Sequence, residues 1–352
     1  MKDANPLPSV SLIICAYNEE KSIEQKIENT LKIKYPEEKL EVIVFDNGSN
    51  DATLETAKRF ENRGIRVYSL NSENRGKVAG LNFVFKLAKG EIVAITDVDC
   101  HLKDNVLLES MPYFNDVKVG AVCGSQILLN PEESQSTQME ESLQGFYKMM
   151  RKAESNIDST IVYNGEFLAF RKDLIGRLDE EVGADDTQIA VRIRQSGHRA
   201  LFLNEANFYE YAPKTLRTRW KQKVRRSSQL VQAIIKYRNL MFKSSEPYNS
   251  IIYPWNFFMH VVSPFFFVSL LAIGVIVAVT DPLFMGSVIL ISALLLLVCV
   301  LVLQIIHKNN FKGVSSALLM FIDAQITLFI GFWVQLRKKP YKWEPLDNTR
   351  RY

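Results

Sequence analysis

Apolar residues in the first hundred positions come in short runs, and the stretches between the runs have helical spacing. The runs are rich in β-branched residues, which is typical of strands buried on both faces. They are VSLIICA at 10–16, EVIVF at 41–45, IRVYS at 65–69 and EIVAIT at 91–96. Ile23, Ile27 and Leu31 share one helical face, and a second helix is predicted after a cap near Asp51. Strands that alternate with helices pair in parallel through right-handed crossovers, so the sequence predicts an α/β domain with a mostly parallel sheet.

A polar turn is associated with each predicted strand. Because the carboxyl ends of parallel strands meet at one edge of a sheet, these turns should lie together and form a ligand site. Any tight turn or helix cap would use the residues from Asp46 to Asp51, and Lys77 also suits a solvated helix start. The occurrence of four polar turns in strand order favours a ligand site. The turns are Tyr17-Asn18-Glu19, Asp46-Asn47, Arg75-Gly76-Lys77 and Asp97-Val98-Asp99.

Asp97 and Asp99 are separated by one valine where the fourth strand ends. Two carboxylates held this close repel each other unless a cation or an array of donors neutralises them. Hard oxygen ligands favour Mg²⁺ or Mn²⁺. A single Asp-X-Asp sequence is common by chance, so the metal prediction depends on the neighbouring turns.

Three apolar windows of 24 residues follow in the second half of the chain, and a bilayer core needs about 20 residues of helix. They are 256–279, 283–306 and 313–336. The first two contain no charged residue and are predicted to form a membrane hairpin. The third has basic flanks on both sides and contains Asp323 and Gln325, so either a third spanning helix or a tilted, re-entrant segment fits. Asp323 is a functional candidate or a residue satisfied by a neighbouring helix.

The total net charge of +4 conceals segments of opposite net charge. Residues 214–243 hold ten Lys or Arg and no acid, residues 244–352 have a net charge of +3, and residues 1–213 therefore have a net charge of −9. A basic segment beside apolar windows predicts contact with anionic membrane lipids on the cytoplasmic side, rather than with nucleic acid.

The cysteines and the N-terminal segment indicate the cellular compartment of the first domain. Cys15, Cys100, Cys123 and Cys299 lie among apolar residues without a CxxC pair, so we expect reduced thiols and no zinc site. No secretion signal precedes the first strand. These features predict that the first domain lies in the cytosol.

Seven ordered motifs resemble those of the family 2 inverting glycosyltransferases, which have a GT-A fold. They span residues 10–226 and are AYNEE, DNGSND, RGKVAGLN, TDVD, NGEFLAFRKDLI, ADDTQIAVRIRQSGHRALF and QKVRR. The membrane-integrated cellulose, hyaluronan and poly-N-acetylglucosamine synthases form the branch that the chain resembles. The resemblance implies a UDP- or GDP-linked sugar donor, with UDP favoured.

The resemblance also implies roles for individual residues. Asp97 and Asp99 would hold the Mg²⁺ or Mn²⁺ that stabilises the diphosphate leaving group. Asp186, the second member of an acidic pair, would be the base that takes the proton of the acceptor hydroxyl; the same pair would otherwise be only a helix cap. The nucleotide-sugar would contact Ala16, Tyr17, Glu19, Asp46, Lys77 and Asp97.

The last motif departs from the family pattern. Chain-extending members show Gln-X-X-Arg-Trp, whereas Gln222 and Arg225 are followed here by Arg226. An aromatic ring stacks on a sugar face, whereas a guanidinium binds phosphate. Arg226 in place of Trp therefore favours a lipid-phosphate acceptor, or the transfer of a single sugar, over chain extension. Together with Asp185, an aspartate where the family usually has glutamate, these three residues are predicted to contact the acceptor or the diphosphate.

We expect four regions from these patterns. They are a cytoplasmic GT-A domain at 1–213, a basic interfacial region at 214–250, a membrane region with two or three spanning helices at 251–336 and a cytoplasmic tail at 337–352. The predicted activity is metal-dependent hexosyl transfer from a nucleotide-sugar to a lipid-linked or polysaccharide acceptor at the cytoplasmic membrane face. The alternatives are a polyprenyl-phosphate sugar synthase and a non-catalytic membrane subunit with the same fold.

Overall fold

The computed structural model describes residues 7–70, 76–284, 286–288 and 311–337. In this part of the chain, eight strands form one sheet in the order β3-β2-β1-β4-β7-β6-β8-β5. The strands are β1 (Val10–Ala16), β2 (Leu40–Asp46), β3 (Ile65–Ser69), β4 (Ile92–Asp97), β5 (Cys100–Leu102), β6 (Val119–Leu128), β7 (Phe167–Arg171) and β8 (Arg199–Glu210). The α-helices are α1 (Ile23–Thr30), α2 (Thr53–Lys58), α3 (Lys77–Leu87), α4 (Val106–Ser110), α5 (Gln135–Ile157), α6 (Asp185–Gln195), α7 (Leu216–Lys236), α8 (Tyr253–Phe257), α9 (Ser263–Thr280) and α11 (Phe311–Leu336).

The first half of the sheet follows the predicted parallel plan. β1 pairs in parallel with β2 and with β4, and β2 pairs in parallel with β3. The second half is mixed, because β7 runs antiparallel to both β4 and β6 while β6 and β8 are parallel. The prediction of an α/β domain is therefore confirmed, but the sheet contains an antiparallel part that the alternation of strands and helices did not indicate.

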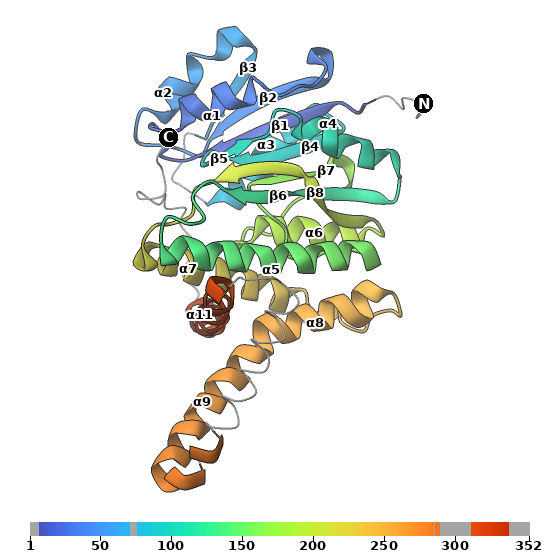
Figure 1. Ribbon diagram of the computed structural model, residues 1–352. Helices are drawn as coiled ribbons and strands as arrows, with labels where there is room; N and C mark the ends of the chain where they lie inside the picture. Colours follow the sequence, from blue (N-terminus) through green and yellow to red (C-terminus); the bar gives the residue numbers. More distant parts are fainter. Residues whose placement is uncertain (1–6, 71–75, 285, 289–310, 338–352) are drawn as a thin grey trace.

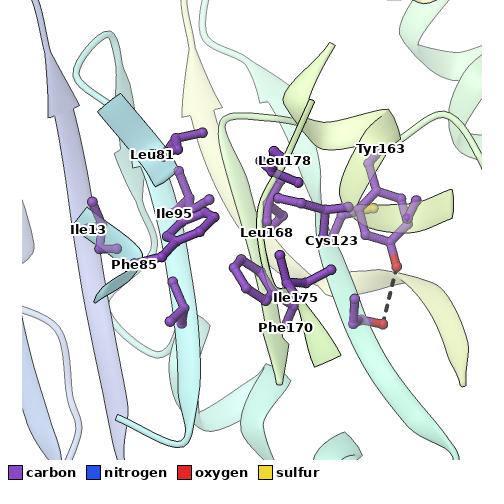
Figure 2. Packing of buried hydrophobic residues seen from close by; sticks show 14 of the residues in the cluster. Ile13, Leu81, Phe85, Ile95, Cys123, Tyr163, Leu168, Phe170, Ile175 and Leu178 are labelled. Carbon is purple, nitrogen blue, oxygen red and sulfur yellow. Dashed lines mark hydrogen bonds between the residues drawn. The ribbon is translucent and has the colours of Figure 1, made fainter. Parts of the chain in front are cut away.

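Side chains on both faces of β4 are buried, as the run of β-branched residues predicted. Val93 and Ile95 pack with Phe85 of α3 on one face, whereas Ile92 and Ala94 belong to a second apolar cluster on the other face. Figure 2 shows the first cluster, in which the side chains of α3 meet those of β4 and β7. This packing fixes the position where β4 ends at Asp97, and with it the edge of the sheet that carries the polar turns.

A layer of helices separates the sheet from the apolar end of the molecule (Figure 1). α5 and α7 lie along one side of the sheet, α11 lies beneath them, and α9 extends away from the sheet. Arg219 of α7 is 1% exposed and pairs with Asp323 of α11 and with Glu140 of α5. The interpretation of Asp323 as a residue satisfied by a neighbouring helix is thus confirmed.

Two described helices have the length and the composition needed to cross a membrane. They are Tyr248–Thr280 and Leu319–Leu336, with mean hydropathies of 2.6 and 1.6. They coincide with the first and third predicted windows. Most of the second window, 283–306, and all of the tail except Arg337 lie outside the described residues, so the predicted hairpin and cytoplasmic tail remain predictions.

Candidate active site

The turns after β1 and β2 interlock at the edge of the sheet. The Asn18 amide donates to Ser49 Oγ at 2.8 Å, and the Asn50 amide donates to Asn18 Oδ1 at 2.8 Å. Asn18 has a φ of 54°, a left-handed conformation that asparagine tolerates better than most residues. A third link runs from the Glu19 amide to Thr53 Oγ1 at 2.6 Å. The predicted nucleotide-binding residues of these two turns therefore lie together.

Ala16 and Asp46 are paired neighbours at the ends of β1 and β2. Asp46 is buried and accepts hydrogen bonds from Ser69 Oγ at 2.8 Å and from the Gly48 and Ser49 amides. Its carboxylate therefore holds the turn, which is the structural role considered for it above. A nucleotide that binds there would meet a carboxylate already oriented by these donors.

Lys77 begins α3 and lies between two carboxylates. Its Nζ is 2.9 Å from Asp97 Oδ1 and 3.2 Å from Asp185 Oδ2. Burial alone would lower the pKa of Lys77, but the charges of Asp185 and Asp97 raise it well above its ordinary value. Lys77 therefore stays an ammonium group and holds the end of β4 next to the start of α6. The interpretation of Lys77 as a solvated lysine is wrong.

The sequence around Lys77 explains this position. Gly76 has a φ of 90°, which lets the chain turn into α3 without strain. A Cβ atom at Gly80 would lie 2.4 Å from the ring of Phe45, so only glycine allows α3 to pack this closely against the end of β2.

Asp97 and Asp99 flank the buried Val98 in the turn between β4 and β5, and both are partly exposed. Within the described residues, no group of three or more His, Cys, Asp or Glu side chains has a metal-binding arrangement. Two partly exposed carboxylates nevertheless fit Mg²⁺ or Mn²⁺, because such ions are commonly held by one or two carboxylates together with substrate phosphates and water. The donor set suits a metal that binds together with its nucleotide.

Asp185 and Asp186 are the first two residues of α6, as the sequence predicted. Asp186 Oδ1 accepts from the Thr187 amide at 2.6 Å. Burial, followed by the charge of Asp185, raises the pKa of Asp186 to about 7. A carboxylate with this pKa can accept a proton near neutral pH, as a general base requires.

A cavity of about 830 Å³ lies between the sheet edge and α7 and extends to α11. Asp186, the candidate base, and two residues of the candidate acceptor motif, Arg225 and Arg226, line this same cavity. The predicted site residues that line it are Lys77, Asp97, Asp185, Asp186, Arg225 and Arg226. The predicted residues that are not part of the described lining are Ala16, Tyr17, Glu19, Asp46, Asp99 and Gln222.

Several residues that line the cavity were not predicted from the sequence. α11 contributes Ala324, Thr327 and Leu328, and α5 contributes Tyr147. Glu166 is a further lining residue, and its Oε1 lies 2.8 Å from Arg226 Nη2. No local pattern could have revealed these walls, because they arise where distant segments of the chain pack together.

Four basic residues of α7 are paired with carboxylates of other elements, namely Arg219, Lys223, Arg226 and Lys236. Lys223 Nζ lies 2.5 Å from Glu140 Oε1, and Arg219 also contacts Glu140. Burial alone would raise the pKa of Glu140, but the charges of Lys223 and Arg219 lower it to about 2. Part of the positive charge of α7 is therefore neutralised inside the protein, whereas Arg217 and Lys221 of the same helix are exposed.

Comparison with known proteins agrees with this geometry. A family model described as glycosyltransferase like family 2 matches residues 8–228. The beta-monoglucosyldiacylglycerol synthase of Trichormus variabilis is 31% identical over 68% of this chain and 52% of its own length. The poly-beta-1,6-N-acetyl-D-glucosamine synthase of Staphylococcus aureus is 25% identical over 63% of this chain and 55% of its own length. The chain thus spans about half the length of these curated relatives.

One solved structure is similar over nearly the whole chain. It is the mannosyltransferase PcManGT from Pyrobaculum calidifontis in complex with GDP-Man and Mn²⁺. The TM-score is 0.77 at 26% sequence identity, and the match covers 95% of this chain and 88% of that chain. The arrangement of elements described above is therefore that of a known transferase.

Proposed function

This chain belongs to the glycosyltransferase like family 2 and is a glycosyltransferase, and from that membership we propose that it is inverting and metal-dependent. It takes a sugar from a UDP- or GDP-linked donor and transfers it to a hydroxyl group of a lipid-linked or polysaccharide acceptor. The observation that carries this proposal is the cavity in which Asp186, with its raised pKa, faces the same space as Lys77 and Asp97.

The donor binds along the ends of β1, β2 and β4. Glu19 and Asp46 hold the base and ribose, and Lys77 contacts the diphosphate. A divalent cation bound by Asp97 and Asp99 would neutralise charge on the departing diphosphate. Mn²⁺ in the PcManGT complex supports this assignment.

Asp186 carries out the proton transfer. The acceptor oxygen attacks the sugar carbon from the side opposite to the diphosphate, and Asp186 takes the proton of that oxygen as the new bond forms. Its position in the cavity wall leaves the carboxylate partly exposed, so the acceptor hydroxyl can reach it. Asp185 keeps Lys77 in place during this step through their ion pair.

A hydroxyl acceptor fits the cavity better than a lipid phosphate. Arg226 contacts Glu166, and Lys223 contacts Glu140. These contacts do not decide between the two acceptors, because Lys77, which we assign to the diphosphate, is also paired with carboxylates. A phosphate acceptor is already ionised and needs no base, whereas a hydroxyl needs one. The proposed hydroxyl acceptor also agrees with the activity that the name of the Trichormus variabilis relative states.

The protein works at the cytoplasmic face of a membrane that its apolar helices cross. Phe266, Leu270 and Val279 of α9 are 67%, 68% and 77% exposed, which would be unfavourable in water and suits lipid. α11 lines the cavity with Thr327 and Leu328, so an acceptor embedded in lipid can approach Asp186 along this helix.

The proposal is tested with membranes that contain the protein, a panel of radiolabelled UDP- and GDP-sugars, and either Mn²⁺ or EDTA. We expect Mn²⁺-dependent label in a lipid or polymer fraction, and label in diacylglycerol-type lipids rather than in polyprenyl phosphate. Asp186→Asn is the control and should bind donor without transfer. Absence of both transfer and donor hydrolysis with every sugar would favour a non-catalytic subunit.

A further inference from the structure

Helix α1 has a lysine on its buried face. The face that packs against the sheet consists of Ile23, Lys26, Ile27 and Thr30, which is the i, i+3, i+4, i+7 spacing of a core-facing stripe. Lys26 is 1% exposed, although a lysine is rarely fully buried without partners. A buried amine that the proposed reaction does not use therefore needs an explanation.

The partners of Lys26 all flank the Asp97–Asp99 turn. Its Nζ donates to Thr96 Oγ1 at 2.7 Å, to the Cys100 carbonyl at 2.7 Å and to Cys100 Sγ at 3.4 Å. These contacts use the three donors of an ammonium group. Thr96 directly precedes the turn and Cys100 directly follows it, so one side chain holds both ends of the turn.

Asn29, one helical turn further along α1, continues this attachment. Its side-chain amide donates to the Leu102 carbonyl at 2.9 Å, and the Leu102 amide donates back to Asn29 Oδ1 at 2.8 Å. We call Lys26 and Asn29 the α1 clamp. The clamp fixes β5 and the preceding turn to α1 through five hydrogen bonds.

The other end of α1 is attached to the first donor-binding turn. The Ser22 and Ile23 amides donate to the Glu19 carbonyl at 3.0 and 2.9 Å. Glu19 lies four residues before the first residue of α1, and Lys26 is the fourth residue of that helix. A hydrogen-bonded turn and the first turn of α1 therefore connect the segment proposed for the nucleoside with the turn proposed for the cation.

We propose that Lys26, assisted by Asn29, is a positioning residue that sets the geometry of Asp97 and Asp99 for a divalent cation and a nucleoside diphosphate. The inference rests on the proposed function. Two carboxylates in a short turn repel each other, and the pairing of β4 with β1 and of β5 with β8 fixes the backbone on either side of the turn without tying its two ends to each other. Lys26 links the two ends through Thr96 and Cys100 before the ligand arrives, so less binding free energy is lost in ordering the turn.

The test compares nucleotide binding with and without metal. Full-length Lys26→Met protein in detergent is titrated with UDP and with GDP by isothermal titration calorimetry, in Mn²⁺ and in EDTA. Methionine keeps the length of the side chain and removes its donors. We expect the gain in nucleotide affinity that Mn²⁺ provides to fall at least about 10-fold, as is typical when groups that orient metal ligands are removed. Affinity in EDTA should stay unchanged.

Lys39→Met is the matched control, because Lys39 Nζ also donates to a backbone carbonyl, that of Leu7 at 2.7 Å, away from the turn. It should bind like the wild type in both conditions. Asn29→Ala removes the second half of the clamp and should reduce the same Mn²⁺-dependent gain by a smaller factor, and it carries the test if Lys26→Met fails to fold.

Two results would overturn the inference. One is an unchanged Mn²⁺-dependent gain in both clamp variants, and the other is an equal loss with Mn²⁺ and EDTA, which would indicate a structural role only. Failure of the proposed function looks different, because the wild type itself would then bind neither UDP nor GDP in a Mn²⁺-dependent manner.

Discussion

Replacing Asp186 with asparagine should abolish transfer and at the same time stabilise the folded protein at about pH 8. Asparagine keeps the size of the side chain and an oxygen that can accept from the Thr187 amide, which lies 2.6 Å from Asp186 Oδ1. It cannot take the proton of the acceptor hydroxyl. We therefore expect kcat to fall by about 10²- to 10⁴-fold, while donor binding is retained.

The stability gain follows from the pKa of Asp186. Burial, followed by the charge of Asp185, raises this pKa from 3.8 to about 7. The folded state binds a proton that the unfolded chain has released between these pH values, so wild-type stability falls as pH rises from about 4 to about 7. A change of this size corresponds to about 4 kcal/mol above pH 7. Because the Asp186 side chain is partly exposed and solvent screens its charge, we expect Asp186→Asn to raise the free energy of unfolding by about half of this, roughly 2 kcal/mol.

Thermal unfolding of the purified protein in detergent, followed between about pH 5 and about pH 9, measures this effect. A gain of about 2 kcal/mol raises Tm by roughly 3 °C at pH 8 and should shrink to about a third of that by pH 5. Asp179→Asn is the control. Burial would raise the pKa of Asp179, but its hydrogen bond with Lys236 lowers it, so the variant should not gain stability at pH 8. A Tm difference for Asp186→Asn that does not vary with pH would refute the reasoning, as would retained transfer.

Three further predictions follow from the same contacts. Lys77→Met should weaken binding of UDP or GDP in Mn²⁺ by about 10- to 100-fold, because it removes a charge-assisted hydrogen bond to the diphosphate, and an unchanged Kd by calorimetry would contradict this. Arg219→Met leaves Asp323 without its buried partner and should lower the free energy of unfolding by about 3 kcal/mol, whereas Arg59→Met, which breaks only an exposed ion pair, should change it by less than about 0.5 kcal/mol. The kcat/KM for transfer should fall as pH drops below about 7, where Asp186 becomes protonated, and a flat pH profile would exclude it as the base.

Much of the donor side of the site could be predicted from the sequence. The buried strands, the polar turns that follow them and the acidic pair at the start of α6 are local features, and the β-branched runs and helix-start chemistry indicate each one. Parallel pairing then brings separate turns to one edge, so the pattern of strands and helices is enough to place Ala16 and Asp46 close together.

The acceptor side could not be predicted in the same way. Whether Arg226 faces a ligand or a carboxylate depends on Glu166, which is sixty residues away and reaches it only through the antiparallel part of the sheet. Lys26 did leave a local signal, since it interrupts the apolar stripe of α1. The signal identifies an anomalous residue but not the turn that the residue holds.

The contact between Arg219 and Asp323 bears on how the enzyme matures during synthesis. The ribosome completes the donor-binding turns and Asp186 well before it makes α11, yet α11 supplies part of the cavity wall. A nascent chain thus carries Asp186, which we propose as the base, before the part of the wall that α11 supplies has been made. The ion pair between Arg219 and Asp323 joins α11 to α7, so we expect the cavity to be complete only after α11 has packed against that helix.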